Sequence, residues 1–144
     1  MFSKACVYAF RATTLIALNS TRGTRLSLDQ IAERTASPRA FTAKVLQQLA
    51  KAGLIRSFKG PNGGFELPEE LARKVTLSRI VELMDGDPIH RGCAMGLEAC
   101  DAKKPCPMHE QFSTIRDELR AMLELTNVHS LTLGLMQGKT HLKR

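Results

Sequence analysis

The sequence predicts a mainly α-helical protein with one small β-hairpin. Apolar residues recur at three- and four-residue spacing in several segments, which is the period of an amphipathic helix. A glycine-rich turn at residues 59–64 separates two short β-prone segments and predicts the hairpin. Residues 108–126 keep apolar side chains at helical spacing throughout, which predicts one long helix.

Three helices are expected before the hairpin. Residues 3–19 are rich in Ala and Leu and contain no Gly or Pro, so they are expected to form a largely buried helix. Ser27 and Gln30 have the spacing of a capping box, which predicts that a second helix begins there. Ser37 as N-cap and Pro38 as first helical residue predict the start of a third helix. The apolar residues of this third helix are Phe41, Val45, Leu46 and Leu49.

Residues 54–58 and 65–67 are expected to form the two strands of the hairpin. Three helices, the last two joined by a tight turn and followed by a hairpin, make up a winged helix-turn-helix. Residues 1–75 carry 12 basic and 5 acidic side chains, whereas residues 76–144 carry 9 of each. A basic unit of this kind favours a polyanion, so double-stranded DNA is the expected partner.

The expected DNA contacts follow from how this motif docks. The second helix of the motif enters the major groove with its N-terminal end, and the wing approaches the minor groove. The helix residues expected to contact DNA are Ser37, Arg39, Ala40, Thr42 and Lys44. The hairpin residues expected to contact DNA are Arg56, Lys59 and Asn62.

The second half of the chain is expected to serve another purpose. Residues 77–84 predict a connecting helix, and a cysteine-rich loop follows it. The apolar residues of the long helix, Phe112, Ile115, Leu119 and Met122, form a stripe that suits a seam between two copies. We therefore expect three units: a winged helix-turn-helix (1–75), a connecting helix with the cysteine loop (76–106), and a dimerisation helix with a C-terminal tail (107–144).

Three of the four cysteines lie in one short segment, as Cys93, Cys100 and Cys106. Clustered thiols of an intracellular protein suit a thiophilic metal or an iron–sulfur cluster. Structural zinc sites mostly use CxxC-type pairs, which this loop lacks, and its longer gaps suit a bulkier cluster. Cys106 is expected at the N-cap of the long helix, with Pro107 as first helical residue, because free N–H groups there favour a thiolate.

Several segments closely resemble the IscR/NsrR-type bacterial transcription regulators. They are residues 37–65 with the wing sequence of residues 59–64, residues 3–9 at the start of the first helix, and residues 106–109. The resemblance covers nearly the whole chain. It implies winged-helix homodimers that bind palindromic operators, with the long helix as the dimer interface.

The resemblance also implies an iron–sulfur cluster with a fourth ligand. IscR-like members supply a histidine three residues beyond the last cysteine to a 2Fe–2S cluster, and His109 has that place. NsrR-like members complete a 4Fe–4S cluster with a residue from the first helix of the partner subunit, where this chain has Cys6. A lone cysteine on an apolar helix is also often a small buried side chain, so both roles stay open for Cys6.

Together these features predict a DNA-binding transcription regulator, a repressor, whose operator affinity is controlled by a cluster that senses nitric oxide, redox state or iron–sulfur status. The alternative is a winged-helix regulator that is stabilised by zinc or responds through bare thiols, without a cluster. The sequence holds no catalytic constellation, so an enzyme is not expected. No segment approaches the roughly 18 apolar residues of a membrane span, and the N-terminus lacks a signal-peptide pattern, so a cytoplasmic protein is expected.

Overall fold

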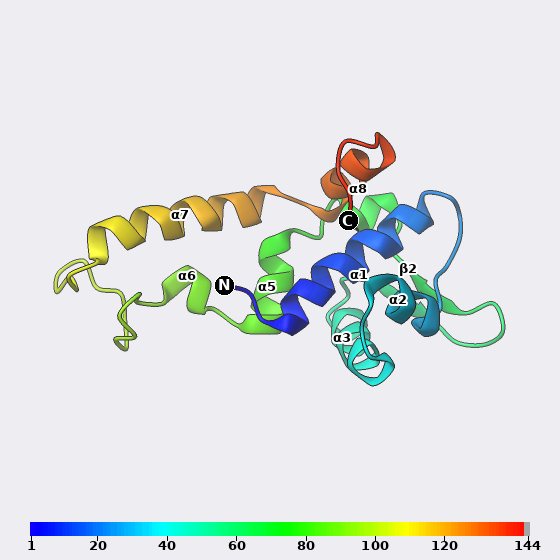
Figure 1. Cartoon of the computed structure of the whole chain (residues 1–144), viewed down its shortest axis with the longest axis horizontal. Coiled ribbons are helices and arrows are strands. Elements are labelled where there is room, and N and C mark those ends of the chain that lie inside the picture. The colour runs from blue at the N-terminus through cyan, green and yellow to red at the C-terminus, as the bar shows by residue number, and fades with distance from the viewer. Residues whose placement is uncertain (143–144) are drawn as a thin grey trace.

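The structure, a computed structural model, describes residues 1–142, without the side chains of Pro88 and His90. It confirms a mainly helical fold with one hairpin (Figure 1). The elements are α1 (Lys4–Ser20), α2 (Leu28–Thr35), α3 (Arg39–Lys51), β1 (Arg56–Phe58), β2 (Gly64–Glu66), α4 (Glu69–Ala72), α5 (Leu77–Asp85), α6 (Pro88–Arg91), α7 (His109–Leu125) and α8 (Val128–Met136).

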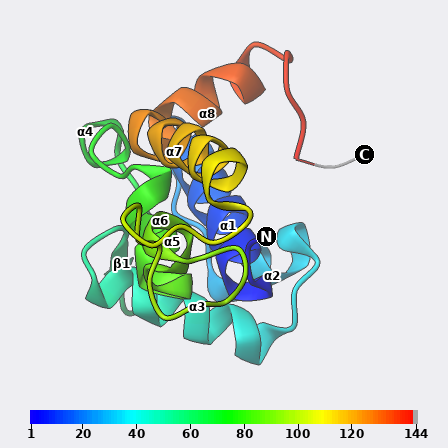
Figure 2. The same cartoon turned by 90° about the vertical axis from the view of Figure 1, so that its left-hand side faces the viewer.

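The elements form a helical body and an arm. In the body α1 packs against α2, α3, α5 and α8, and the antiparallel hairpin β1–β2 lies at its edge, with Ser57 opposite Phe65. The arm consists of α6, α7 and the loop between them, and it extends away from the hairpin (Figure 1). Viewed from the end of this arm, α7 lies in front of the body (Figure 2). The loop with the three cysteines is therefore far from the expected wing.

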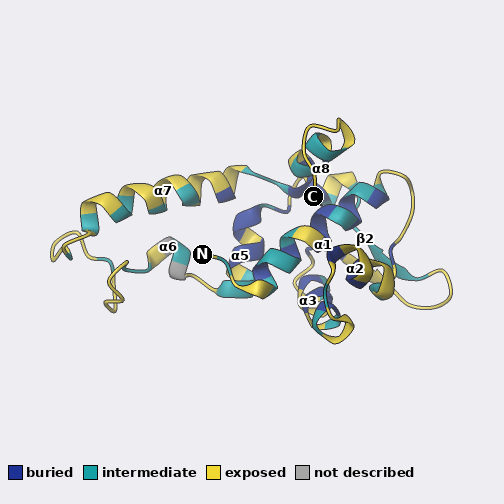
Figure 3. Ribbon diagram, in the orientation of Figure 1, coloured by how far each residue is buried: buried dark blue, intermediate teal, exposed yellow. Residues whose placement is uncertain are grey.

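Buried residues are concentrated in the body, whereas the residues of the arm are mostly exposed or half-buried (Figure 3). All but one of the largest fully buried side chains come from the helices of the body and the segments between them; they include Ile16, Ile31, Leu46, Leu49, Leu54, Leu67 and Ile80. In α7 only Leu123 is buried, next to the point where the chain returns to the body. The body thus has its own apolar core, because burial of such side chains is the main favourable term in folding.

The observed N-terminal residues of α2 and α3 can be compared with those expected from the sequence. The capping box at Ser27 and Gln30 is present, and each side chain accepts the backbone N–H of the other residue. The prediction for α3 was wrong by one residue, because Pro38 is the N-cap and its carbonyl accepts the first helical N–H, from Thr42. The Ser37 hydroxyl is buried and has no hydrogen-bond partner among the described residues.

Three short helices were not expected from the sequence. The helices α4 and α6 have four residues each, too few to show an apolar period. The helix α8 was assigned to the C-terminal tail, although Asn127 caps it by accepting the N–H of Ser130. It packs on α1, and Thr76 pairs with Asn127, so packing crosses the expected unit boundaries. The division into three units stays a prediction, and its last residues, 143–144, lie outside the described part.

The turn between α2 and α3 yields a stability prediction. Ala36 ends α2 with φ 51°, in the left-handed region that glycine adopts without strain. We expect Ala36→Gly to raise the free energy of unfolding by about 0.5–1 kcal/mol in urea titrations. Ala52→Gly is the matched control, because Ala52 ends α3 with φ −78°. Equal effects of the two substitutions would contradict the assignment.

Candidate functional site

The helix α3 presents a polar face opposite the core. Thr42, Val45, Leu46 and Leu49 are its buried residues. The opposite side of the same helix carries Ala40, Lys44, Gln47 and Lys51, all exposed. A helix with one face fixed in the core and a basic face outside can lie in a major groove.

Two of the residues expected to contact DNA from this helix are not available to do so. Arg39, Ala40 and Lys44 are exposed as expected, and Arg39 forms an ion pair with Asp29 at 2.6 Å between Nε and Oδ1. Thr42 is only 3% exposed, and its hydroxyl donates to the carbonyl of Pro38 at 3.0 Å. Because its side chain faces the core, we correct the expectation that it contacts DNA.

Ser37 is corrected in the same way, because its hydroxyl oxygen is buried. Gln47 and Lys51 also lie on the exposed face of α3, although they were not among the residues expected to contact DNA. The signal was available, since Gln47 lies three residues and Lys51 seven residues beyond Lys44, on the same helical face.

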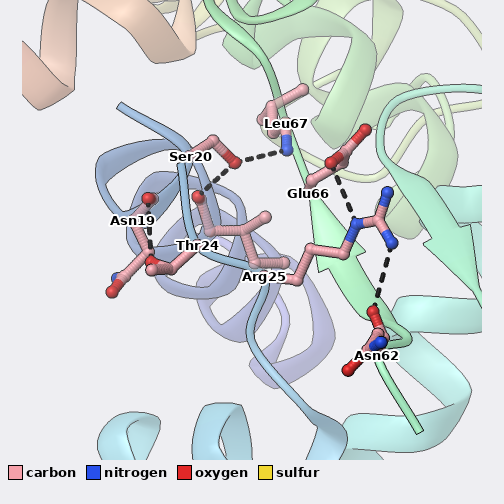
Figure 4. Close-up of polar contacts among 8 residues, drawn as sticks. Asn19, Ser20, Thr24, Arg25, Asn62, Glu66 and Leu67 are labelled. Atoms are coloured by element: carbon pink, nitrogen blue, oxygen red, sulfur yellow. Dashed lines mark hydrogen bonds and ion pairs between the residues drawn. The ribbon is translucent and has the colours of Figure 1, made fainter. Parts of the chain in front are cut away.

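The hairpin carries the other expected contacts on its exposed surface. Arg56, Lys59 and Asn62 are all exposed, and Arg56 lies 3.7 Å from Glu70 in an ion pair. A missed residue, Arg25, supports the hairpin from the side (Figure 4). Its Nε contacts Glu66 at 3.1 Å, and its Nη1 donates to the carbonyl of Asn62 at 3.1 Å.

The Arg25 guanidinium also stacks over the Phe58 ring, with its Cζ 3.6 Å from the ring centroid. These contacts join residues more than thirty positions apart, so no local pattern could reveal them. The root of the hairpin is tied to α1 as well, because the Ser20 hydroxyl accepts the N–H of Leu67 at 2.8 Å (Figure 4). The wing is thus held to the body at its root and along one side.

Position 64 requires glycine because the hairpin backbone passes close to Leu26 there. Gly64 has φ 126°, and a Cβ atom there would lie 2.7 Å from the carbonyl oxygen of Leu26. We expect Gly64→Ala to lower the free energy of unfolding by about 2–3 kcal/mol, from backbone strain and the collision together. Gly60→Ala is the control, because Gly60 has φ 94° but open space around it, so about 1 kcal/mol is expected. Equal losses in the two variants would contradict the close approach to Leu26.

The cysteine loop runs from the end of α6 to the start of α7 and brings its candidate ligands into two pairs. The sulfur atoms of Cys93 and Cys106 are 3.7 Å apart. The sulfur of Cys100 lies 3.3 Å from Nδ1 of His109, the first residue of α7. All four residues are half-buried, so each pair is open to solvent on one side.

The separation within the first pair has a chemical meaning. Two thiolates bound to one tetrahedral metal at about 2.3 Å lie about 3.7–3.8 Å apart. The distance between Cys93 and Cys106 matches that value. Within residues 1–142, however, no three His, Cys, Asp or Glu side chains gather closely enough to hold a single metal ion. The donors therefore fit a group that takes ligands in pairs better than one ion bound by all of them.

The electrostatics of the loop favour anionic sulfur at one position. Hydrogen bonds from the backbone N–H groups of Leu97 and Met95 lower the pKa of the Cys93 thiol below its usual value. Cys106 was expected at the N-cap of the long helix, and this was wrong, because Met108 is the N-cap of α7. The carbonyl of Cys106 instead accepts the N–H of His109 at 2.9 Å, which makes a turn before the helix starts.

A half-buried positive charge lies beside the loop. Arg116 in α7 has a side chain only 14% exposed, and its Nη1 donates to the carbonyl of Gly92 at 3.4 Å. Its Nε is buried without a hydrogen-bond partner among the described residues, and the Asp117 carboxylate lies 3.7 Å away. A half-buried guanidinium that contacts Gly92, and whose buried Nε has no hydrogen-bond partner among the described residues, suits a negatively charged group bound by the loop.

Cys6 lies apart from the loop. Its side chain is 0% exposed in the core of the body, and it belongs to the same apolar cluster as Ala9 and Ile80. Burial, with a smaller contribution from Asp85, raises the pKa of the Cys6 thiol from 9.0 to about 12. These features fit a small buried side chain rather than a thiolate ligand.

The raised pKa of Cys6 predicts a pH dependence. The folded protein holds the thiol proton more tightly than the unfolded chain, so this stability is complete below pH 9.0 and is lost as the pH rises toward about 12. We expect the free energy of unfolding of the native chain to fall more steeply above about pH 9 than that of Cys6→Ala. Parallel pH profiles of the two proteins would contradict the burial of a neutral thiol.

Comparison with known proteins places the chain in a family. Residues 2–133 match the sequence profile of Rrf2, described as an iron-dependent transcriptional regulator. The chain belongs to the Rrf2 family. A protein of Aquifex aeolicus that is named as an HTH-type transcriptional regulator is 32% identical over 133 residues, or 91% of this chain and 90% of that protein. The IscR regulator of Aliivibrio salmonicida is 28% identical over 120 residues, or 81% of this chain and 68% of that protein. This Rrf2 protein is therefore a transcriptional regulator.

Solved structures share the fold of this Rrf2 protein. The IscR structure from T. potens superimposes with a TM-score of 0.73 at 17% identity and covers 99% of this chain and 93% of that one. CymR, the global cysteine regulator of B. subtilis, superimposes with a TM-score of 0.72 at 21% identity, covering 92% of this chain and 95% of that one. The predicted winged helix-turn-helix is confirmed by these likenesses. No helix within residues 1–142 combines the length and the apolar character needed to cross a membrane.

Proposed function

We propose that this Rrf2 protein is a homodimeric DNA-binding repressor whose operator affinity is set by an iron–sulfur cluster in its cysteine loop. The observation that carries the proposal is the arrangement of the loop in two pairs, Cys93 with Cys106 and Cys100 with His109. The loop that holds these pairs lies at one end of the molecule and the wing at the other, with the basic helix α3 on the lower side of the body between them (Figure 1).

The ligands are Cys93, Cys100, Cys106 and His109. A 2Fe–2S cluster has two irons that each take two protein ligands, and histidine replaces cysteine in some such clusters. Two pairs of donors match this requirement, which favours 2Fe–2S over 4Fe–4S. The deep burial of Cys6 argues against its use as a ligand. When bound, the cluster supplies a redox-active, nitric-oxide-sensitive group whose loss frees the thiols.

The chain's own residues hold such a group in place. Backbone N–H groups of the loop stabilise the Cys93 thiolate, and Arg116 anchors Gly92 and offers a positive charge beside it. His109 is fixed by being the first residue of α7, so its ring orientation depends on where that helix begins. Any change in the loop is thereby passed directly to α7.

The partner proposed for α7 is the same helix of a second copy. Its exposed face includes Ile115, 61% exposed, Met122, 46% exposed, and Leu125, 83% exposed. A row of apolar side chains on a projecting helix favours association with an apolar surface. A dimer with two-fold symmetry presents two recognition helices and suits a palindromic operator.

Two hydrogen bonds within the body lie at the point where the chain leaves it for the arm. The carboxylate of Asp85, the last residue of α5, accepts the backbone N–H of Ser3 at 2.9 Å and also the Ser3 hydroxyl proton. Ser3 in turn caps α1, and α1 packs against α3. Movement of the arm at the end of α5 can therefore shift the helix that positions α3, which is how a cofactor biases a two-state protein.

The experiment compares two forms of the same protein. Operator sequences are first selected from a random DNA pool, and fluorescence anisotropy then measures the affinity of anaerobically purified protein and of protein stripped of its cluster. We expect affinities that differ by about tenfold or more. Equal affinities and equal sequence preferences in the two forms would overturn the proposal.

The colour of the purified protein separates the cluster from zinc. An iron–sulfur protein is brown and contains acid-labile sulfide, whereas a zinc protein is colourless. Iron and sulfide at about two atoms each per subunit are expected for 2Fe–2S. Zinc in place of iron would instead support the zinc-stabilised regulator.

A further inference from the structure

We propose that Cys93 and Cys106 form an intramolecular disulfide when the loop is free of a metal group and meets a peroxide, and that this bond blocks cluster assembly. The disulfide itself does not depend on the proposed function. The block on assembly does rest on it, because only then are the same sulfurs needed as ligands.

The sulfur atoms of Cys93 and Cys106 lie close enough to form a bond after a small movement. The two sulfurs are in contact at 3.7 Å, so a shift of less than about 2 Å brings them to the 2.05 Å of a disulfide. Both residues are half-buried, so a small oxidant can reach them. Both also lie outside helices, at the two ends of the loop between α6 and α7, where the backbone can adjust.

The third cysteine of the loop, Cys100, contacts a different residue. The sulfur of Cys100 lies against the His109 ring at 3.3 Å, in a separate pair. Cys6 is buried in the core, beyond the reach of a solvent oxidant. The structure therefore selects one disulfide among the pairings that four cysteines allow.

The chemistry needs hydrogen peroxide as the oxidant. The Cys93 thiolate attacks one peroxide oxygen, the O–O bond breaks, and the departing hydroxide takes up a proton to become water. Cys93 is then a sulfenic acid. The Cys106 thiolate attacks its sulfur, the S–O bond breaks, and the second hydroxide also becomes water. One peroxide thus gains two electrons from two thiols and yields one disulfide and two waters.

The bond has a functional consequence. It closes the loop between α6 and α7 and removes both sulfurs of the first pair, which are the two protein ligands proposed for one of the two irons. An oxidised protein is expected to stay without a cluster until a thiol reductant cleaves the bond. Peroxide would then decide whether the thiols are free, and the supply of iron and sulfide would decide whether free thiols receive a cluster.

The mapping experiment uses the full chain stripped of metal. It is treated anaerobically with one equivalent of hydrogen peroxide, alkylated, and digested with trypsin and a glutamyl endopeptidase. Cleavage after Glu98 separates Cys93 from Cys100, so mass spectrometry distinguishes their bridges. We expect the bridge between the Cys93 and Cys106 peptides in the native chain and in Cys100→Ser, and its loss in Cys106→Ser. A dominant bridge through Cys100, or free thiols throughout, would overturn the disulfide.

A second measurement tests the block on assembly. The oxidised protein is incubated anaerobically with iron and sulfide, before and after treatment with dithiothreitol. We expect cluster absorbance to fall to under about a tenth of the control and to return after reduction. Full assembly on the bridged protein would overturn the block while leaving the disulfide standing. If the reduced protein also takes up no cluster, the proposed function fails and only the mapping result bears on the disulfide.

Discussion

Cys106→Ser is expected to abolish the iron–sulfur absorbance of the protein and to leave its operator affinity at the value of the stripped form. Cys106 belongs to the pair with a 3.7 Å separation between sulfurs, and a hydroxyl is a much weaker ligand for iron than a thiolate. Absorbance spectra, iron content and anisotropy on one anaerobic preparation measure this outcome. Cys93→Ser and Cys100→Ser are expected to behave alike.

Cys6→Ala provides the matched control, since it also removes a thiol but one that is 0% exposed in the core. We expect full cluster content and normal operator response from this variant. His109→Ala should lose only part of its cluster, because a neutral imidazole can be replaced by water or a buffer base more easily than a thiolate. Loss of the cluster in Cys6→Ala, with retention in His109→Ala, would move the fourth ligand to α1.

The second large effect is expected at the recognition helix. Ala40→Glu adds a carboxylate to the exposed face of α3, where phosphates and base edges would approach. We expect operator binding to fall by about a hundredfold or more, since a misplaced charge at such an interface costs several kcal/mol. The free energy of unfolding should change little, because the side chain points into solvent.

The control for Ala40→Glu is Gln137→Glu, which makes the same change in charge at the exposed end of α8. It should weaken binding less than about threefold, through net charge alone. Equal losses in the two variants would indicate that α3 is not the reading helix. Native affinity in Ala40→Glu would also exclude the proposed docking.

The sequence was sufficient where a feature depends on neighbouring residues. The capping box at Ser27 and Gln30 is local, and the structure confirms it. The hairpin followed from its glycines in the same way, although its first strand is shorter than expected and its second begins one residue earlier. Such features are encoded by backbone chemistry over a few positions, and the rest of the fold does not need to be known.

The sequence predictions were wrong for single residues whose placement depends on tertiary packing. Thr42 lies on the buried face of α3, and the hydroxyl of Ser37, just before the helix, is buried, so both lost their expected role. Arg25 and Arg116 could not be found from sequence, because each acts on residues more than twenty positions away. The pairing of thiols is of the same kind, since the spacing of Cys93, Cys100 and Cys106 does not reveal which two lie in contact.

Control of operator affinity by the cluster is tested most directly by following one sample through loss and recovery of its cluster. Operator affinity is measured on the anaerobic protein, again after chelation of iron, and again after rebuilding with iron and sulfide, with cluster content recorded at each step. We expect the operator affinity to change by about tenfold or more when the cluster is lost and to return when it is rebuilt. An operator affinity that stays constant while the cluster leaves and returns would contradict control of DNA binding by the cluster.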